Sequence, residues 1–96
     1  MAEFDDTTEM EFRGLPVFLS TSAVGECLRW RMSIHDIVAI LDEGVDCSEC
    51  QRRSDVIERC STFRHQWMKV VAVANYHYTT KEECWLVTHV GEAKRP

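Results

Sequence analysis

The chain has 96 residues, the size of one domain, and 45% of them are hydrophobic, which is typical of a globular protein. The formal net charge of −5 argues against non-specific binding to nucleic acid, which needs a positive field. The sequence has no run of about 18 apolar residues that would cross a membrane. Its acidic start lacks the basic and apolar regions of a signal peptide, so we expect a cytoplasmic protein with no membrane contact.

Residues 1–13 are the most acidic part of the chain, with five acidic residues and no basic one in the first 11. This composition predicts a flexible, solvated arm, and an arm that shields a basic surface is the alternative. The expected domain then covers residues 14–91, followed by a polar tail at 92–96. Outside the arm the charge is close to neutral.

A short strand and a helix are expected first. The turn at 14–16 leads into a strand at 17–19, and residues 20–22 are all of types that cap a helix. An apolar stripe at helical spacing then predicts a helix whose buried side carries Ala23, Val24, Cys27 and Leu28.

The second helix has the clearest local signal in the chain. Ser33, followed three residues later by Asp36, matches a capping-box pattern, and Ile37 and Leu41 belong to its apolar stripe. Gly44 is placed to end the helix in a left-handed conformation. We therefore predict a helix at residues 34–43.

Three antiparallel strands are expected in the rest of the chain. A polar loop at 45–54 precedes a strand at 55–63, and the turn at 63–66 lacks Gly or Asn, so its register is not fixed by the sequence. The next two strands, at 67–78 and 84–90, are long and alternating. A loop at 79–83 would place Tyr78 opposite Cys84.

This order predicts an α+β fold, with a short N-terminal strand, two helices and a three-stranded antiparallel meander. The helices are expected to pack on one sheet face, against Met68, Val70, Ala72, Ala74, Leu86 and Val90. The opposite face would stay open and carry Trp67, Lys69, His77, Trp85 and His89.

The segments SAVGECLRWRMSIHDIVAILDEG, VIERC, WMKVVAVA and WLVTHVGE resemble the small DUF4258 domains over residues 17–91. That family looks related to the RelE/ParE-type toxins. The resemblance implies a toxin-like fold, RNA cleavage from the open face of the sheet, and an antitoxin as partner. This chain has Ser22 where the family usually has His, and Glu26 and Trp30 where it has arginines.

Residues suited to RNA cleavage lie on the expected open face and the strand beside it. Attack by a 2′-hydroxyl needs a base, an acid and cations near the phosphate, and histidine titrates in the right range. The expected register separates the two histidines by about 13 Å, at about 3.3 Å per residue, so at most one of them contacts the phosphate. The candidate catalytic residues are His89, Lys69, Arg59 and His77, and the candidate substrate-binding residues are Trp85, Trp67 and Arg64.

The cysteines raise the second candidate site. The spacing of Cys47 and Cys50 fits two thiolates on one tetrahedral zinc ion, although no second close pair follows. Five cysteines, an odd number, in an intracellular chain favour free thiols or metal ligands over disulfides. We expect either free thiols in a loop or a structural zinc site formed by Cys47, Cys50, Cys60 and His65, and no other cofactor.

Two classes of function follow from these patterns. The first is a metal-independent ribonuclease of the toxin–antitoxin type, which predicts a concave, basic open face. The second is a non-catalytic module that binds a protein partner or a second copy of itself through the open face or a sheet edge. The second class predicts a flatter and more apolar face with scattered charges.

Overall fold

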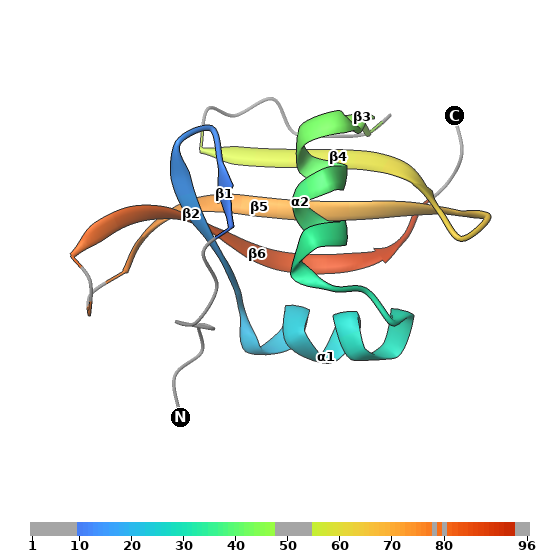
Figure 1. Cartoon of the computed structure of the whole chain (residues 1–96), viewed down its shortest axis with the longest axis horizontal. Helices are drawn as coiled ribbons and strands as arrows, with labels where there is room; N and C mark the ends of the chain where they lie inside the picture. The colour runs from blue at the N-terminus through green and yellow to red at the C-terminus, as the bar shows by residue number, and fades with distance from the viewer. Residues whose placement is uncertain (1–9, 48–54, 78, 80, 94–96) are drawn as a thin grey trace.

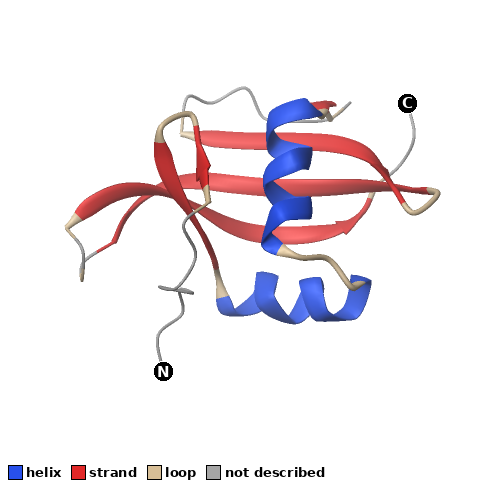
Figure 2. Ribbon diagram, viewed as in Figure 1, coloured by secondary structure: helices blue, strands red, loops and turns tan. Residues whose placement is uncertain are grey.

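A mixed sheet forms the body of the protein, and both helices lie against it (Figures 1 and 2). The computed structural model describes residues 10–47, 55–77, 79 and 81–93. The sheet order is β1-β2-β6-β5-β4-β3, with β2 parallel to β6 and the other neighbours antiparallel. The elements are β1 (Glu11–Phe12), β2 (Leu15–Leu19), α1 (Thr21–Trp30), α2 (Ile34–Glu43), β3 (Val45–Asp46), β4 (Val56–Phe63), β5 (Gln66–His77) and β6 (Glu82–Glu92).

The α+β fold predicted from the sequence is confirmed: a first strand, two helices and an antiparallel meander follow one another in the expected order. The described sheet has two more strands than expected. β1 places Phe12 in the core, so part of the segment expected to be a flexible acidic arm belongs to the sheet. β3 lies where only a polar loop was expected.

The second helix has the expected capping box. The Ser33 hydroxyl accepts a hydrogen bond from the Asp36 N–H at 3.2 Å, and the Asp36 carboxylate accepts one from the Ser33 N–H at 2.8 Å. The helix crosses the sheet over β4 and β5 (Figure 1) and fully buries Ile37 and Leu41. Because both cap groups satisfy otherwise unpaired backbone donors, the start of α2 is fixed by local sequence.

Gly44 ends α2, but not in the expected left-handed conformation, because its φ is −72°. The reason for glycine at this position is space. A Cβ here would meet the backbone carbonyl oxygen of Ile40 and would lie 2.8 Å from that of Cys60. Gly44 therefore lets the helix end close against β4.

The first helix begins directly from the strand before it. The Ser20 N–H donates to the Val87 carbonyl of β6 at 2.9 Å, while the Ser20 hydroxyl caps α1 by accepting from the Ala23 N–H at 3.1 Å. One residue therefore ends β2 on the sheet and starts α1, which runs along the outer edge of β6 (Figure 1).

Only half of the apolar stripe expected on α1 is buried. Ala23 and Cys27 lie in the core, whereas Val24 is 38% exposed and Leu28 76% exposed. The reason is that α1 lies at the edge of the sheet rather than across its face, so it buries a narrower strip. The described core is formed by Phe12, Val17, Leu19, Ala23, Cys27, Met32, Ile37, Val38, Ile40, Leu41, Ile57, Met68, Val70, Ala72, Trp85, Val87 and Val90.

A β-bulge in β6 decides which side chains face the helices. Val71 pairs with His89, but the next residue, Ala72, pairs with Val87, so Thr88 is the extra residue. The expected register, with Tyr78 opposite Cys84, is wrong, because His77 already pairs with Glu82. Strict alternation cannot reveal a bulge, since one inserted residue turns the rest of the strand over.

Candidate functional site

The open face is the side of the sheet opposite α2. Val71, Val73 and Leu86, each partly exposed, form its apolar centre on β5 and β6. Leu86 was expected on the helix side, and the register places it opposite Val73 instead. Around this centre lie Trp67, Lys69, Glu58, Cys60 and His89.

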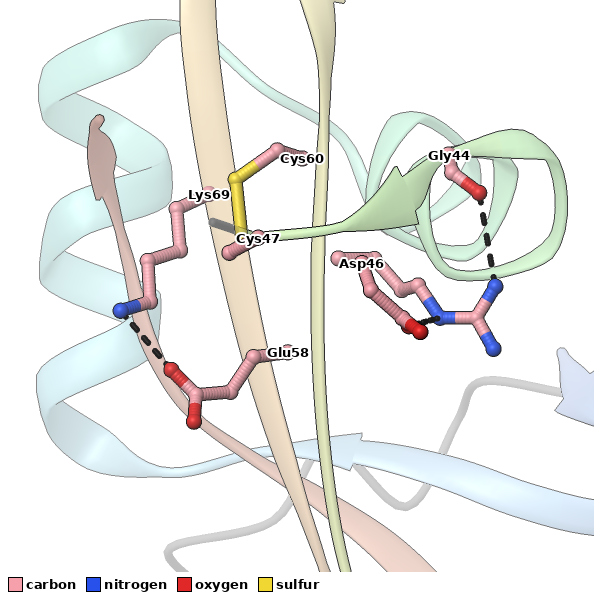
Figure 3. Close-up of a disulfide and its surroundings, with 7 residues drawn as sticks. Gly44, Asp46, Cys47, Glu58, Cys60 and Lys69 are labelled. Carbon is pink, nitrogen blue, oxygen red and sulfur yellow. Dashed lines mark hydrogen bonds and ion pairs between the residues drawn. A yellow bond between two sulfur atoms is a disulfide. The ribbon is translucent and has the colours of Figure 1, made fainter. Parts of the chain in front are cut away.

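Lys69 points from β5 onto the open face, as expected, but its charge is neutralised there. Its Nζ lies 2.8 Å from Oε1 of Glu58 on the neighbouring strand β4 (Figure 3). The Lys69 side chain is 29% exposed and that of Glu58 10%, so the pair is shielded from bulk solvent more than a surface ion pair. Lys69 thus reaches the face as half of an ion pair.

His89 also lies on the open face, held by a residue that the sequence did not indicate. One carboxylate oxygen of Glu26, on α1, lies 3.1 Å from His89 Nδ1. The other accepts a hydrogen bond from the Val90 N–H at 3.0 Å. Glu26 therefore satisfies the free edge of β6 and orients the imidazole at the same time. Nothing in the sequence marks it, because its role depends on α1 lying along that edge.

The absence of a side chain at Gly91 leaves room for the imidazole of His89. A Cβ at Gly91 would lie 3.0 Å from His89 Nε2 and 3.2 Å from Cε1, closer than such contacts normally come. The ring therefore lies above the backbone of Gly91, which pairs with Lys69. The bulge, Glu26 and Gly91 together set the orientation of His89, whose side chain remains 50% exposed.

Trp85 and Arg59 do not lie on the open face. The bulge turns Trp85 toward the core, where it is 6% exposed and meets Phe12 edge-to-face at a centroid distance of 6.1 Å. Arg59 faces the α2 side, with Nε 3.2 Å from an oxygen of Asp46 and a hydrogen bond to the Gly44 carbonyl. The structure therefore does not place Trp85, expected to bind substrate, or Arg59, expected to be catalytic, on the open face.

The other expected site residues are spread along the sheet. Trp67 is partly buried on the open face, opposite Thr62. Arg64 lies in the β4–β5 turn, with its guanidinium 4.9 Å from the ring centroid of Phe63. His77 is the last residue of β5; it pairs with Glu82, six residues further along β5 than the partner of His89. The structure therefore does not bring the two histidines together, since six residues correspond to about 20 Å.

Cys47 and Cys60 form neither the free thiols nor the zinc site that the sequence suggested. Cys47 and Cys60 form a disulfide across β3 and β4, with Cα atoms 5.3 Å apart, a normal separation for such a bond (Figure 3). The expectation of free thiols is wrong for this pair, and while it is oxidised it offers no thiolate to a metal. Cys50 lies outside the described residues, and His65 lies in the β4–β5 turn. Within the described ranges, no three His, Cys, Asp or Glu residues form a group that could hold a metal ion.

Cys27 and Cys84 are free and buried, as expected for small core residues. Burial raises the pKa of the Cys27 thiol to about 11, with a further contribution from the nearby charges of Glu26 and Asp36. Burial also raises the pKa of Cys84. Both cysteines are therefore thiols near neutral pH, and neither is suited to be a nucleophile.

Comparison of the chain with protein-family models, with curated proteins and with solved structures finds no match. Neither of the two helices described here is long and apolar enough to span a membrane.

Proposed function

We propose that this domain is a non-catalytic interaction module that associates with a second copy of itself through the open face. One observation carries the proposal: a partly exposed apolar centre is bordered by Lys69 and His89, each of which already has a carboxylate partner within the chain. Covering the Lys69–Glu58 pair costs little further hydration, because both side chains are already largely removed from solvent.

The proposal is tested by the molar mass of the protein in solution. Val73→Glu places a charge in the centre of the open face, so the wild type should be a dimer by light scattering and this variant a monomer. Leu28→Glu is the matched control: Leu28 is the most exposed large apolar residue described, and it lies on α1. A monomeric wild type at high concentration, or equal dissociation of both variants, would overturn the proposal.

A second candidate is RNA cleavage, as in the toxin family that the sequence resembles. The pairing of Glu26 with Nδ1 of His89 favours it, because a carboxylate on that nitrogen leaves Nε2 free to accept a proton. Glu58 weakens Lys69 as the cation of such a site. The test is cleavage of a mixed RNA substrate by wild type, His89→Ala and Glu26→Gln. Loss of activity in both variants would support this function, and no cleavage by the wild type would remove it.

A further inference from the structure

Cys47 and Cys60 lie on the same face of the sheet as the Lys69–Glu58 pair. The register pairs Val45 with Cys60, and Cys60 in turn with Lys69. The Cys47 N–H donates to the Glu58 carbonyl at 3.3 Å, so Cys47 lies opposite Glu58. Residues two apart on a strand point to the same side, so the two cysteines are diagonal neighbours on one face. Figure 3 shows both side chains on the side that carries Lys69 and Glu58.

The backbone holds the two sulfur atoms close together without the bond between them. β4 pairs with β5 along all of its eight residues, which fixes Cys60. On the other strand, the ion pair between Asp46 and Arg59, at 3.2 Å, remains when the disulfide is broken. Cys47 is 8% exposed and Cys60 1%. Reduction therefore leaves two neighbouring thiols that are shielded from water.

Within the part of the chain that the structure describes, this site offers a metal two sulfur atoms and no third ligand. Glu58, opposite Cys47, has its carboxylate paired with Lys69 at 2.8 Å. His89 is three strand spacings from Cys47 in the same cross-strand row, about 14 Å. Structural zinc takes four ligands, whereas copper(I) is a soft ion that prefers thiolates and is stable between two of them. The donor set therefore favours copper(I).

We propose that the reduced pair of Cys47 and Cys60 is a binding site for copper(I), held between the two sulfur atoms. A dithiol reductant first supplies two electrons and two protons, so that the disulfide becomes two thiols and the reductant its own disulfide. Copper(I) then forms two bonds to sulfur, and the thiols release their two protons to solvent. The oxidation state of copper does not change. Lys69, the β5 partner of Cys60, places a positive charge beside the anionic complex.

The first test is a copper(I) titration of the Cys50→Ser variant in competition with the chelator bicinchoninate. Cys50 lies outside the described residues, and its replacement removes a third thiolate from the count. After anaerobic reduction and removal of the reductant, the variant should take one equivalent of copper(I) from the chelator, whereas its oxidised form should take none. Equal uptake in both redox states, or no uptake by the reduced form, would overturn the proposal.

The ligands are identified in two ways. X-ray absorption of the copper-loaded Cys50→Ser protein needs no further substitution and should show two sulfur neighbours and no nitrogen or oxygen. Adding Cys47→Ser or Cys60→Ser should abolish uptake, whereas Cys27→Ala should not, because Cys27 is a free thiol in the core on the helix side. Circular dichroism checks that each reduced variant is folded. Nitrogen ligands, or uptake that survives either serine substitution, would overturn the site.

The selectivity for copper(I) is tested by thermal unfolding. A metal ion between the two sulfurs closes the same loop as the disulfide, so copper(I) should raise the Tm of the reduced Cys50→Ser protein toward that of its oxidised form. The same amount of zinc should leave the Tm unchanged, because only two ligands are offered. An equal rise with zinc, or no rise with copper(I), would contradict the proposal.

Discussion

The outer sides of β6 and β4 are covered by different contacts. On the β6 side, β2 pairs with the strand as far as Val87, and from there the Glu26 carboxylate on α1 satisfies the Val90 N–H. On the β4 side, the two-residue strand β3 pairs with β4, and the disulfide between Cys47 and Cys60 joins the two strands covalently. The first side is covered by a strand and by a carboxylate from a helix, whereas the cover of the second includes a covalent bond that a reductant can break. Exposed strand edges favour unwanted pairing, so both sides need cover.

Removing the disulfide should give the largest change and act on the β4 side alone. Cys47→Ser/Cys60→Ser should lower the free energy of unfolding by about 3 kcal/mol, because the bond closes a loop with a sequence separation of 13. Urea unfolding of wild type with and without dithiothreitol measures the same quantity, and the double variant should be insensitive to the reductant. Identical unfolding midpoints of oxidised and reduced wild type would contradict this account.

Gly44→Ala should also weaken the β4 side. A Cβ at this position would collide with backbone oxygens of Ile40 and Cys60, so we expect a loss of about 2 kcal/mol in the free energy of unfolding. Gly25→Ala is the control on the other side, because it lies within α1 and its Cβ would meet nothing within 4 Å. That change should stabilise the protein by about 0.5–1 kcal/mol. Equal effects of the two changes would argue against close packing at Gly44.

Glu26→Ala should open the β6 side. It leaves the Val90 N–H without its acceptor, and we expect a loss of about 1–2 kcal/mol, as for a partly exposed hydrogen bond to a charged group. Glu26→Gln keeps an oxygen that can accept from Val90, so its loss should be smaller. Thermal unfolding ranks the two variants, and NMR of the His89 ring reports its orientation. A ring signal unchanged in Glu26→Ala would show that Glu26 does not position His89.

The smallest expected change is a gain of stability from a substitution in the β4–β5 turn. Arg64 and His65 both have positive φ, 51° and 71°, in a two-residue turn that favours Asn-Gly. His65→Gly should therefore raise the free energy of unfolding by about 0.5–1 kcal/mol, since glycine adopts this conformation without strain. Chemical denaturation measures it, and Gln66→Gly, within β5, should instead destabilise.

Local signals predicted the fold better than the site. The Ser33–Asp36 cap and the alternation of Met68, Val70 and Ala72 depend on neighbouring residues, and the structure places them as expected. The bulge at Thr88 is not visible in an alternating pattern, and for that reason Trp85 was placed on the wrong face. The roles of Glu26 and of the Cys47–Cys60 bond depend on segments far apart in the chain, which no local pattern reports.

The double role of Ser20, which bonds to β6 and caps α1, has a consequence for the pairing of β2 with β6. β5 and β6 are neighbours in the chain and can pair early, whereas β2 must find β6 across more than 60 residues, a slow kind of contact. Ser20 bonds to Val87 and also caps α1. A register shift of β2 by two residues would therefore displace the helix by about 6–7 Å and break the hydrogen bond between Glu26 and Val90. A misregistered β2 would thus lose the helix contacts as well, so the contacts of α1 favour the native register of β2.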